Sequence, residues 1–274
     1  MNETATRELE SMAEAIADGT RLAVPSDSHG VAMAATRALV RRGVRDLHLL
    51  CVPTSGIQAD VLIGAGGVAA IETSAVALGE HGAAPQFSAA VRAARVRILD
   101  ATCPAIYAGL QAAQKGLPFM PLRGLIGSDL LTHRPDWKLI DNPFARGDPI
   151  VVLPAIRPDV ALFHAPWADR DGNVFIGRSR ELLTMAQAAR ASFVTVEEIR
   201  ADDLLADPER AAGAIPAIYV TRIAVAKRGA WPLGLSGCYG ADAAALARYA
   251  QAARTPAGFR AWLDSWLAAE IAPA

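Results

Sequence analysis

Residues whose side chains and backbone could perform chemistry are concentrated between positions 46 and 86. An apolar run at 47–52 is followed there by Thr54, Ser55 and Gly56. Sheets of the α/β type bind their ligands at the carboxyl ends of such buried parallel strands. Hydroxyl and amide groups at this point could hydrogen-bond a carbonyl or carboxylate oxygen. We therefore interpret the stretch as the wall of an active site for an acyl group or a thioester.

A glycine cluster follows a second apolar run, at 61–63. We predict that this run is a strand and that residues 68–80 form a helix. Gly64, Gly66 and Gly67 would let the backbone lie close to a ligand. The first amides of the predicted helix would face that ligand with the positive end of the helix dipole. The cluster therefore predicts a site for an anion or a developing oxyanion.

The same cluster permits two other interpretations. Gly64, Gly66 and Ala69 have the G-x-G-x-x-A spacing of a dinucleotide site, although no acidic residue ends a second strand about twenty residues later, as that fingerprint requires. A tight turn without chemical function is equally compatible with the glycines. Glu72 and Glu80, in the predicted helix, could contact a substrate or be solvated charges on a helix face.

Polar loops elsewhere supply further candidates. Ser26 and His29 follow the first predicted strand, where His29 could bind a ligand or act as a base, but polar residues in such loops also cap helices. Asp100 ends another predicted strand and could act as an acid or base, or cap the next helix. Arg123 and Gly124 lie in a second glycine-containing loop, where Arg123 could pair with a carboxylate or phosphate of a ligand.

These candidates must be positioned by a parallel sheet. Residues 21–25 form a predicted strand, 31–43 a helix and 47–52 the next strand, which is one βαβ crossover with both polar loops on the same edge. We therefore predict an α/β fold with an open, largely parallel sheet and helices on both faces. The chain is expected to be a single domain over 1–274, with the proline-broken segment 133–147 as an excursion or a small lid.

The composition narrows the classes of partner. Of the 274 residues, 52% are apolar and 20% are charged, and the net charge is -1. This balance allows a large core and favours neither nucleic acid nor an anionic membrane as a partner. The sequence has no run of eighteen apolar residues and no apolar signal region, so we expect a cytoplasmic protein. The three cysteines are widely spaced, and we expect no metal and no tightly bound cofactor.

Five segments of the sequence resemble the corresponding segments of one known family. They are the stretch 46–91, which contains the features above, GLPFMPLRGLIGSDLL at 116–131, APWADRDGNVFIG at 165–177, FVTVEEI at 193–199 and, more loosely, LSGCYGADAAAL at 235–246. In these segments the sequence resembles the A (alpha) subunits of family I CoA-transferases, most nearly the glutaconate CoA-transferase branch.

The resemblance implies a partner and a reaction. A-type chains of this family share an open α/β fold and assemble with a homologous B subunit, with the acyl-CoA site between them. The family passes CoA from one carboxylic acid to another through a glutamyl-CoA thioester, using a glutamate of the B chain in a Ser-Glu-Asn-Gly motif. That motif is absent here, so this chain would contribute walls and orienting groups rather than the nucleophile. Coenzyme A thioester is then a substrate.

Two alternatives remain open at this point. A related pair of subunits opens a steroid-derived ring hydrolytically on a CoA thioester, and its base is an acidic residue of the A-type chain; Asp100 or His29 would have that role here. A non-catalytic binding or assembly subunit is the second alternative. The transferase hypothesis assigns substrate contacts to a set drawn from the loops and the glycine cluster: Ser26, Ser55, Gly56, Gly64, Gly66, Gly67, Glu72, Glu80, Arg123 and Gly124.

Overall fold

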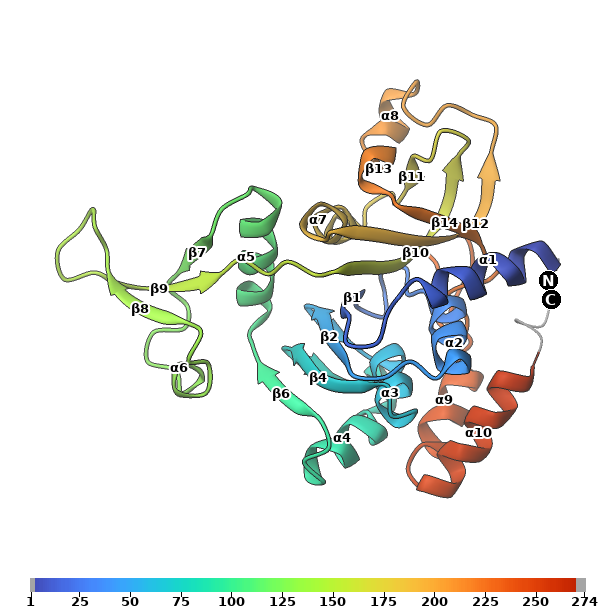
Figure 1. Ribbon diagram of the computed structural model, residues 1–274, viewed down its shortest axis with the longest axis horizontal. Helices are drawn as coiled ribbons and strands as arrows, with labels where there is room; N and C mark the ends of the chain where they lie inside the picture. Colours follow the sequence, from blue (N-terminus) through green and yellow to red (C-terminus); the bar gives the residue numbers. More distant parts are fainter. Residues whose placement is uncertain (1–2, 270–274) are drawn as a thin grey trace.

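The computed structural model describes residues 3–269 and is built on a largely parallel sheet (Figure 1). Seven of its strands run parallel to their neighbours, and two short strands at one side pair antiparallel. The predicted open α/β sheet is therefore confirmed. In spatial order the strands are β14 (Arg222–Val225), β12 (Ala191–Arg200), β10 (Val160–Asp169), β1 (Arg21–Pro25), β2 (Leu47–Val52), β4 (Val68–Thr73) and β6 (Arg97–Asp100).

Helices cover both faces of the sheet because its central strands are apolar on both sides. Leu49 and Cys51 belong to the core under one face, and Leu50 and Val52 belong to the core under the other. This alternation follows from the two-residue period of a strand. The first face packs against α1 (Glu3–Glu14), α2 (Met33–Arg42), α3 (Ile57–Gly64), α4 (Pro85–Arg92), α9 (Ala243–Ala252) and α10 (Pro256–Ala268), and the second against α5 (Cys103–Gln114) and α7 (Arg180–Ala188).

Two sequence-based element predictions are wrong. The run 61–63 belongs to helix α3, and residues 68–80 form β4, the short strand β5 (Ala75–Val76) and the 3-10 helix η1 (Gly79–His81). Alanine-rich segments favour a helix by propensity. Here, however, the backbone of 68–73 completes ladders with β2 and β6 on either side. Tertiary pairing therefore overrides the local preference.

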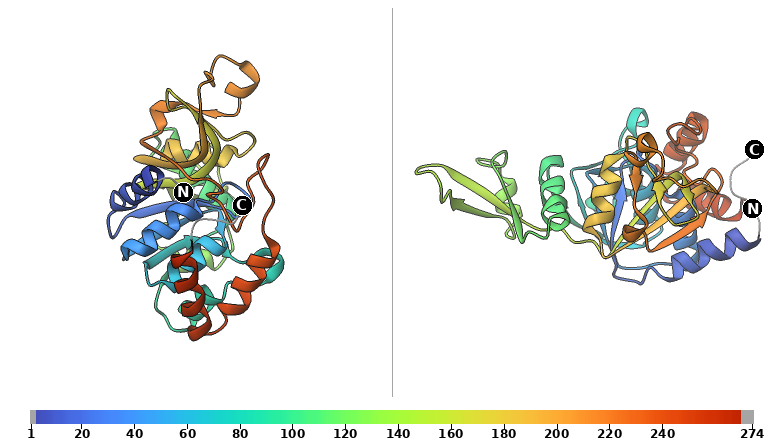
Figure 2. Two further views of the ribbon diagram at one scale, coloured as in Figure 1. Left: turned by 90° about the vertical axis from the view of Figure 1, so that its right-hand side faces the viewer. Right: turned by 90° about the horizontal axis from the view of Figure 1, so that it is seen from above.

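A projecting arm is formed by the part of the chain that connects β6 to β10. It is an antiparallel three-stranded sheet of β7 (Phe119–Leu122), β9 (Pro149–Pro154) and β8 (Lys138–Asp141), with the short helix α6 (Leu130–His133). The arm extends to the left in Figure 1, and Figure 2 shows that α1 and α10 lie at the opposite end of the molecule. The excursion predicted at 133–147 is part of this larger arm.

The remaining short elements extend the sheet beside β10. Asp171 and Gly172 lie in the turn that joins β10 to the antiparallel β11 (Val174–Phe175), which pairs with β13 (Ala214–Ile215). Gly172 has φ of +90°, a conformation that favours glycine. Other short elements are β3 (Thr54–Ser55), α8 (Pro208–Ala211) and η2 (Ala217–Tyr219). Among the described residues, no helix has the length and apolar character to cross a membrane.

Candidate active site

A cavity of about 490 Å³ opens at the carboxyl ends of β1, β2 and β4. Loops that follow these strands line it together with three residues of the carboxyl-terminal part of the chain. This is the edge at which parallel sheets of this class hold ligands. Its lining residues are Ser26, Asp27, Ser28, Thr54, Ser55, Ala75, Ala77, Leu78, Gly79, Glu80, His81, Leu233, Leu246 and Tyr249.

Asp27 lies at the floor of this cavity and caps helix α3. Its Oδ1 accepts the backbone N–H of Gly56 at 3.0 Å, and its Oδ2 accepts that of Ile57 at 3.2 Å. A carboxylate is stabilised at a helix amino terminus. Burial nevertheless raises the pKa of Asp27 to about 6, because it outweighs these two hydrogen bonds and is reinforced by the nearby charge of Asp60. Asp27 thus titrates near neutral pH inside the cavity.

Gly56 is required by the close approach of Asp27. A Cβ atom at this position would lie 2.0 Å from Asp27 Oδ2 and 2.7 Å from the carbonyl oxygen of Ala77. Its backbone N–H is already occupied by Asp27. This amide therefore does not form an empty oxyanion site in the present arrangement, and the expected use of glycine amides as anion donors is not supported at Gly56.

The Gly56→Ala substitution is expected to destabilise the protein by about 1–3 kcal/mol through overpacking. Gly124→Ala is the matched control, because a Cβ at Gly124 would meet nothing within 4 Å and its φ is not in the left-handed region. Thermal unfolding followed by circular dichroism measures both. Equal midpoints for the two variants would contradict the packing described here.

Ser55 lines the cavity, but its hydroxyl group is not exposed to it. The residue is 3% exposed, and its Oγ is buried without a hydrogen-bond partner of normal geometry among the described residues. A buried hydroxyl without a partner is costly, and a ligand could reach this one only after a local movement. Cys51 lies in the preceding strand, where burial raises the pKa of its thiol to about 12. The thiol is therefore not an active nucleophile.

A second buried carboxyl group supports the site from behind. Asp60 Oδ2 accepts the hydroxyl of Tyr249 at 2.6 Å, and Oδ1 accepts the backbone N–H of Phe87 at 2.7 Å. Burial raises the pKa of Asp60 to about 6 despite these bonds. The same burial, together with the Asp60 charge, raises the pKa of Tyr249 well above its usual value. This contact fixes α9, which carries the cavity wall, to α3.

Four predicted site residues lie at or beside the cavity. Ser26, Ser55 and Glu80 are among its lining residues, and Gly56 begins α3 directly beneath it. Glu80 stands at the outer rim, since its side chain is 82% exposed.

His29 does not line the cavity. Its Nδ1 lies 2.8 Å from Ser26 Oγ, and its Nε2 lies 3.3 Å from Glu181 Oε1, so the ring holds the loop against α7.

The glycine cluster lies at the other edge of the sheet from this cavity, and the helix predicted to follow it is absent. Gly64, Gly66 and Gly67 form the turn between α3 and β4, and a strand rather than a helix follows them. Gly66 has φ of +79°, which favours glycine in a tight turn. The carbonyl oxygen of Gly67 accepts the backbone N–H of Leu47 at 2.9 Å where β2 begins. The turn therefore has a structural function here.

Glu72 is likewise separate from the cavity. It is 1% exposed, and it accepts Arg21 Nη2 at 2.6 Å and Arg134 Nη2 at 2.8 Å. Arg134 also bonds Asp136 and lies over the ring of Trp137, 4.2 Å from its centroid. Burial opposes the charge of Arg134, but Asp136 and Glu72 together raise its pKa above the usual value. Glu72 therefore fastens the base of the arm to β4.

The remaining candidates also lie elsewhere. Arg123 is in the arm and forms an exposed two-point contact with Asp148, and Gly124 is beside it. Asp100 is exposed at the end of the edge strand β6, and it does not line the cavity. An acid or base role for Asp100 or His29 on a ligand in this cavity therefore has no geometric support.

Sequence reasoning missed several of the residues that the cavity brings together. From the sequence, Asp27 is expected only to cap a helix, and Asp60 and Tyr249 have no expected role. One signal was available for Asp27, since it lies between two candidates, Ser26 and His29, in a loop at a strand end. Within residues 3–269, no group of three or more histidine, cysteine or acidic residues could hold a metal ion.

Comparison with known proteins shows the family of this chain. Residues 7–226 match the family described as coenzyme A transferase. This chain belongs to the coenzyme A transferase family. The A subunit of the 3-oxoadipate CoA-transferase of Pseudomonas knackmussii is 31% identical over 94% of this chain and 91% of that protein. The A subunit of the glutaconate CoA-transferase of Acidaminococcus fermentans is 32% identical over 85% and 78% of the two chains.

Other relatives within the same fold have different names. The "cholesterol ring-cleaving hydrolase IpdA subunit" of Rhodococcus jostii is 27% identical over 86% of this chain and 82% of that protein. The crystal structure of a variant of the decarboxylase AibA/AibB aligns with a TM-score of 0.84 and 31% identity over 96% and 97% of the chains. The structure of glutaconate CoA-transferase from Acidaminococcus fermentans gives 0.85 and 28% over 94% and 87%. The fold is thus that of the transferase family.

Proposed function

We propose that this coenzyme A transferase chain is the A subunit of a two-chain enzyme that moves CoA between carboxylic acids. Both transferase relatives described above are named as A subunits, and the first aligns over nearly the full length of both chains. The partner is a homologous B subunit that carries the nucleophilic glutamate. The cavity at the carboxyl edge of the sheet is the part of the acyl-CoA site that this chain supplies.

The observation that carries this proposal is that neither carboxyl group in the cavity is free and buried, as a nucleophile would be. Asp27 and Glu80 are the carboxylic residues among its lining residues. Both oxygens of Asp27 accept backbone N–H groups, and Glu80 is at the solvent-exposed rim. Neither is held as a nucleophile that faces a buried substrate. A second chain that covers the opening would supply the missing group.

The proposed exchange has two displacements in each direction. The partner's glutamate carboxylate attacks the thioester carbonyl, which forms a mixed anhydride and releases the CoA thiolate. The thiolate then attacks the glutamyl carbonyl, which forms glutamyl-CoA and releases the first carboxylic acid as its carboxylate. The second acid reverses both steps. In this chain Ser55 lines the cavity, and Asp27 holds the loop at 26–30 against α3.

Covalent trapping tests the proposal. The chain is co-expressed with the product of the neighbouring gene, and the complex is incubated with dicarboxylic acyl-CoA thioesters. Borohydride reduction or hydroxylamine cleavage is followed by mass spectrometry of both chains. We expect a CoA-dependent modification on a glutamate of the partner and none on this chain.

Three results would contradict the transferase assignment. A modification on this chain would place the nucleophile here. Consumption of the thioester without an acid acceptor and without a trapped glutamate would indicate a hydrolase. A complex that binds CoA thioester without consuming it would indicate a binding subunit.

A further inference from the structure

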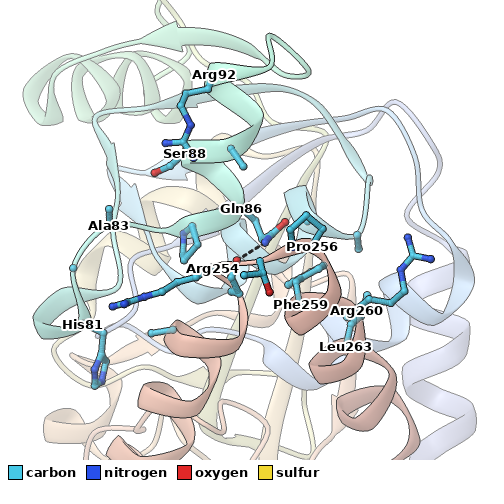
Figure 3. A pocket seen from close by; sticks show the side chains of 18 of the residues that line it. His81, Ala83, Gln86, Ser88, Arg92, Arg254, Pro256, Phe259, Arg260 and Leu263 are labelled. Atoms are coloured by element: carbon cyan, nitrogen blue, oxygen red, sulfur yellow. Dashed lines mark hydrogen bonds between the residues drawn. The ribbon is translucent and has the colours of Figure 1, made fainter.

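A second and larger hollow lies on the far side of the η1 segment from the active-site cavity. It has a volume of about 960 Å³ and runs between α4, the end of α9 and the start of α10 (Figure 3). We call it the arginine groove. His81 lines both hollows, so the two are separated only by this short segment of chain.

The groove is positively charged. Arg92, Arg95, Arg254 and Arg260 line it, and no aspartate or glutamate is among its lining residues. The four side chains have no ion pair within residues 3–269, whereas Arg123, Arg200 and Arg210 on other surfaces each pair with a carboxylate. The chain has 28 acidic and 27 basic residues, so this absence of acids is local. Unpaired like charges around one hollow favour an anionic occupant.

The arrangement of the polar groups suits phosphate. Figure 3 shows Arg254 extending toward the segment that carries His81 and Ala83, and Arg92 lying beside Ser88. The Nε2 atom of His81 is buried and has no hydrogen-bond partner among the described residues; Glu80 Oε1 is 3.8 Å away. Guanidinium groups bind phosphate oxygens with two parallel hydrogen bonds. The phosphate contacts would therefore come from the exposed guanidinium groups.

The groove also has an apolar side that a simple ion would leave empty. Pro256, Phe259 and Leu263 of α10 line it together with Pro85 of α4. Pockets for organic ligands combine such apolar walls with a few convergent polar groups. The volume and the number of cationic side chains therefore fit a molecule that carries more than one charge and a planar apolar part.

The walls of the groove are held in place by specific packing. Gln86 is 9% exposed, and its Nε2 donates to the carbonyl oxygen of Ala253 at 2.6 Å, which joins α4 to the end of α9 (Figure 3). A Cβ at Gly64 would lie 2.4 Å from Phe259 Cζ and 2.8 Å from Gln86 Cγ. Gly64 thus permits the close contact of α3 with both walls.

We propose that the arginine groove binds the phosphate groups of an adenine nucleotide, with the base against the apolar wall of α10. The nucleotide is either the phosphorylated end of a CoA thioester, in which case the inference rests on the proposed function, or a free nucleotide. Both sources present the same chemistry to the arginines. The proposal assigns the groove a ligand that the active-site cavity does not require.

Isothermal titration calorimetry of the full chain tests this assignment without any turnover. The probes are adenosine 3′,5′-bisphosphate and ADP, with glutarate as a dianionic carboxylate for comparison. We expect the nucleotides to bind more tightly than glutarate. The double variant Arg92→Gln/Arg254→Gln should weaken nucleotide binding at least about 10-fold, because two charge-assisted contacts are lost.

Arg157→Gln is the matched control, since Arg157 is exposed and does not line the groove. It removes the same kind of charge and should leave nucleotide affinity unchanged. The substituted groove arginines are also exposed, so the unfolding midpoint should be preserved, which separates lost binding from lost folding. Absence of nucleotide binding, equal losses in control and double variant, or tighter binding of glutarate would each overturn the proposal.

A competition experiment separates the two sources. If saturating CoA prevents the bisphosphate from binding, the groove holds the phosphorylated end of CoA. If the nucleotide binds with unchanged affinity beside CoA, a free nucleotide occupies the groove. Both outcomes support the phosphate site provided that binding depends on Arg92 and Arg254. Failure of the trapping experiment with a positive calorimetric result would reject the transferase and retain the groove.

Discussion

The Asp27→Asn variant is expected to lower kcat by about 100-fold in the complex with its partner. The two oxygens of Asp27 accept the N–H groups of Gly56 and Ile57, and an asparagine amide can offer only one acceptor. Its NH2 group would oppose the second N–H, so the loop would move away from α3. Displacements of about 1 Å in a positioning element can cost about 100-fold in rate. Steady-state kinetics with saturating acyl-CoA and acceptor acid measures the change.

The pH dependence gives this prediction a second and more specific measurement. The pKa of Asp27 is about 6 in the folded chain, so the carboxylate that accepts both N–H groups is lost as pH falls through about 6. We expect the wild-type kcat to fall with this inflection. The Asp27→Asn variant should lack it, because no group titrates at that position.

Ionisation of Asp27 is expected to support kcat but to lower the free energy of unfolding. The folded pKa of Asp27 lies above its usual value of 3.8, so ionisation costs stability as pH rises from about 4 to about 6, and the cost is complete above that range. Asp60 has the same elevated pKa and should contribute in the same direction. Chemical denaturation at pH 4, 5, 6 and 7 measures the free energy of unfolding for the wild type, Asp27→Asn and Asp60→Asn.

Asp60→Asn is the matched control for the kinetic prediction. Asp60 is buried behind the site and does not line the cavity. This variant should remove part of the pH dependence of stability but keep the inflection in kcat. The pH of that inflection should be slightly lower than in the wild type, because the Asp60 charge raises the pKa of Asp27. Loss of the inflection in Asp60→Asn, or its persistence in Asp27→Asn, would remove Asp27 from the positioning of the site.

The Glu72→Gln variant is expected to lose about 1–3 kcal/mol of folding free energy. Glu72 and Arg134 are 1% and 4% exposed, and their ion pair is formed away from solvent. Glutamine keeps the size of the side chain but leaves the Arg134 and Arg21 guanidinium groups without the carboxylate that both contact. Arg134 keeps its ion pair with Asp136, so the cost comes from the charge-assisted hydrogen bonds that Glu72 loses. Denaturant unfolding followed by circular dichroism measures it.

Asp148→Asn provides the comparison for this ion pair. Asp148 pairs with Arg123, whose side chain is 64% exposed, and exposed pairs contribute little to stability. Its unfolding midpoint should remain within experimental error of the wild type. A comparable loss in both variants would mean that the Glu72 contact is no stronger than a surface ion pair and does not anchor the arm.

The parts of the fold that could be predicted are those whose signal is local. The runs 21–25 and 47–52 are largely apolar and end in or just before proline, which is typical of strands buried on both faces. The runs 61–63 and 68–80 are assigned wrongly from the sequence because the contacts that decide them are not local. Gln58, in the helix that contains 61–63, is buried and donates to Thr36 Oγ1 at 2.9 Å, a partner that periodicity does not reveal.

The family, its α/β sheet and the expected position of the active site at the strand ends near Ser26 and Ser55 were determined by the sequence itself. They depend on runs of residue types and on motifs, which are properties of neighbours along the chain. The tertiary structure alone decided which polar groups meet. Asp27 reaches Gly56 across 29 positions, Arg134 reaches Glu72 across 62, and Tyr249 reaches Asp60 across 189. Each carboxyl group acquires its partners and its environment from distant segments, so its charge state and its role follow only from the packed fold.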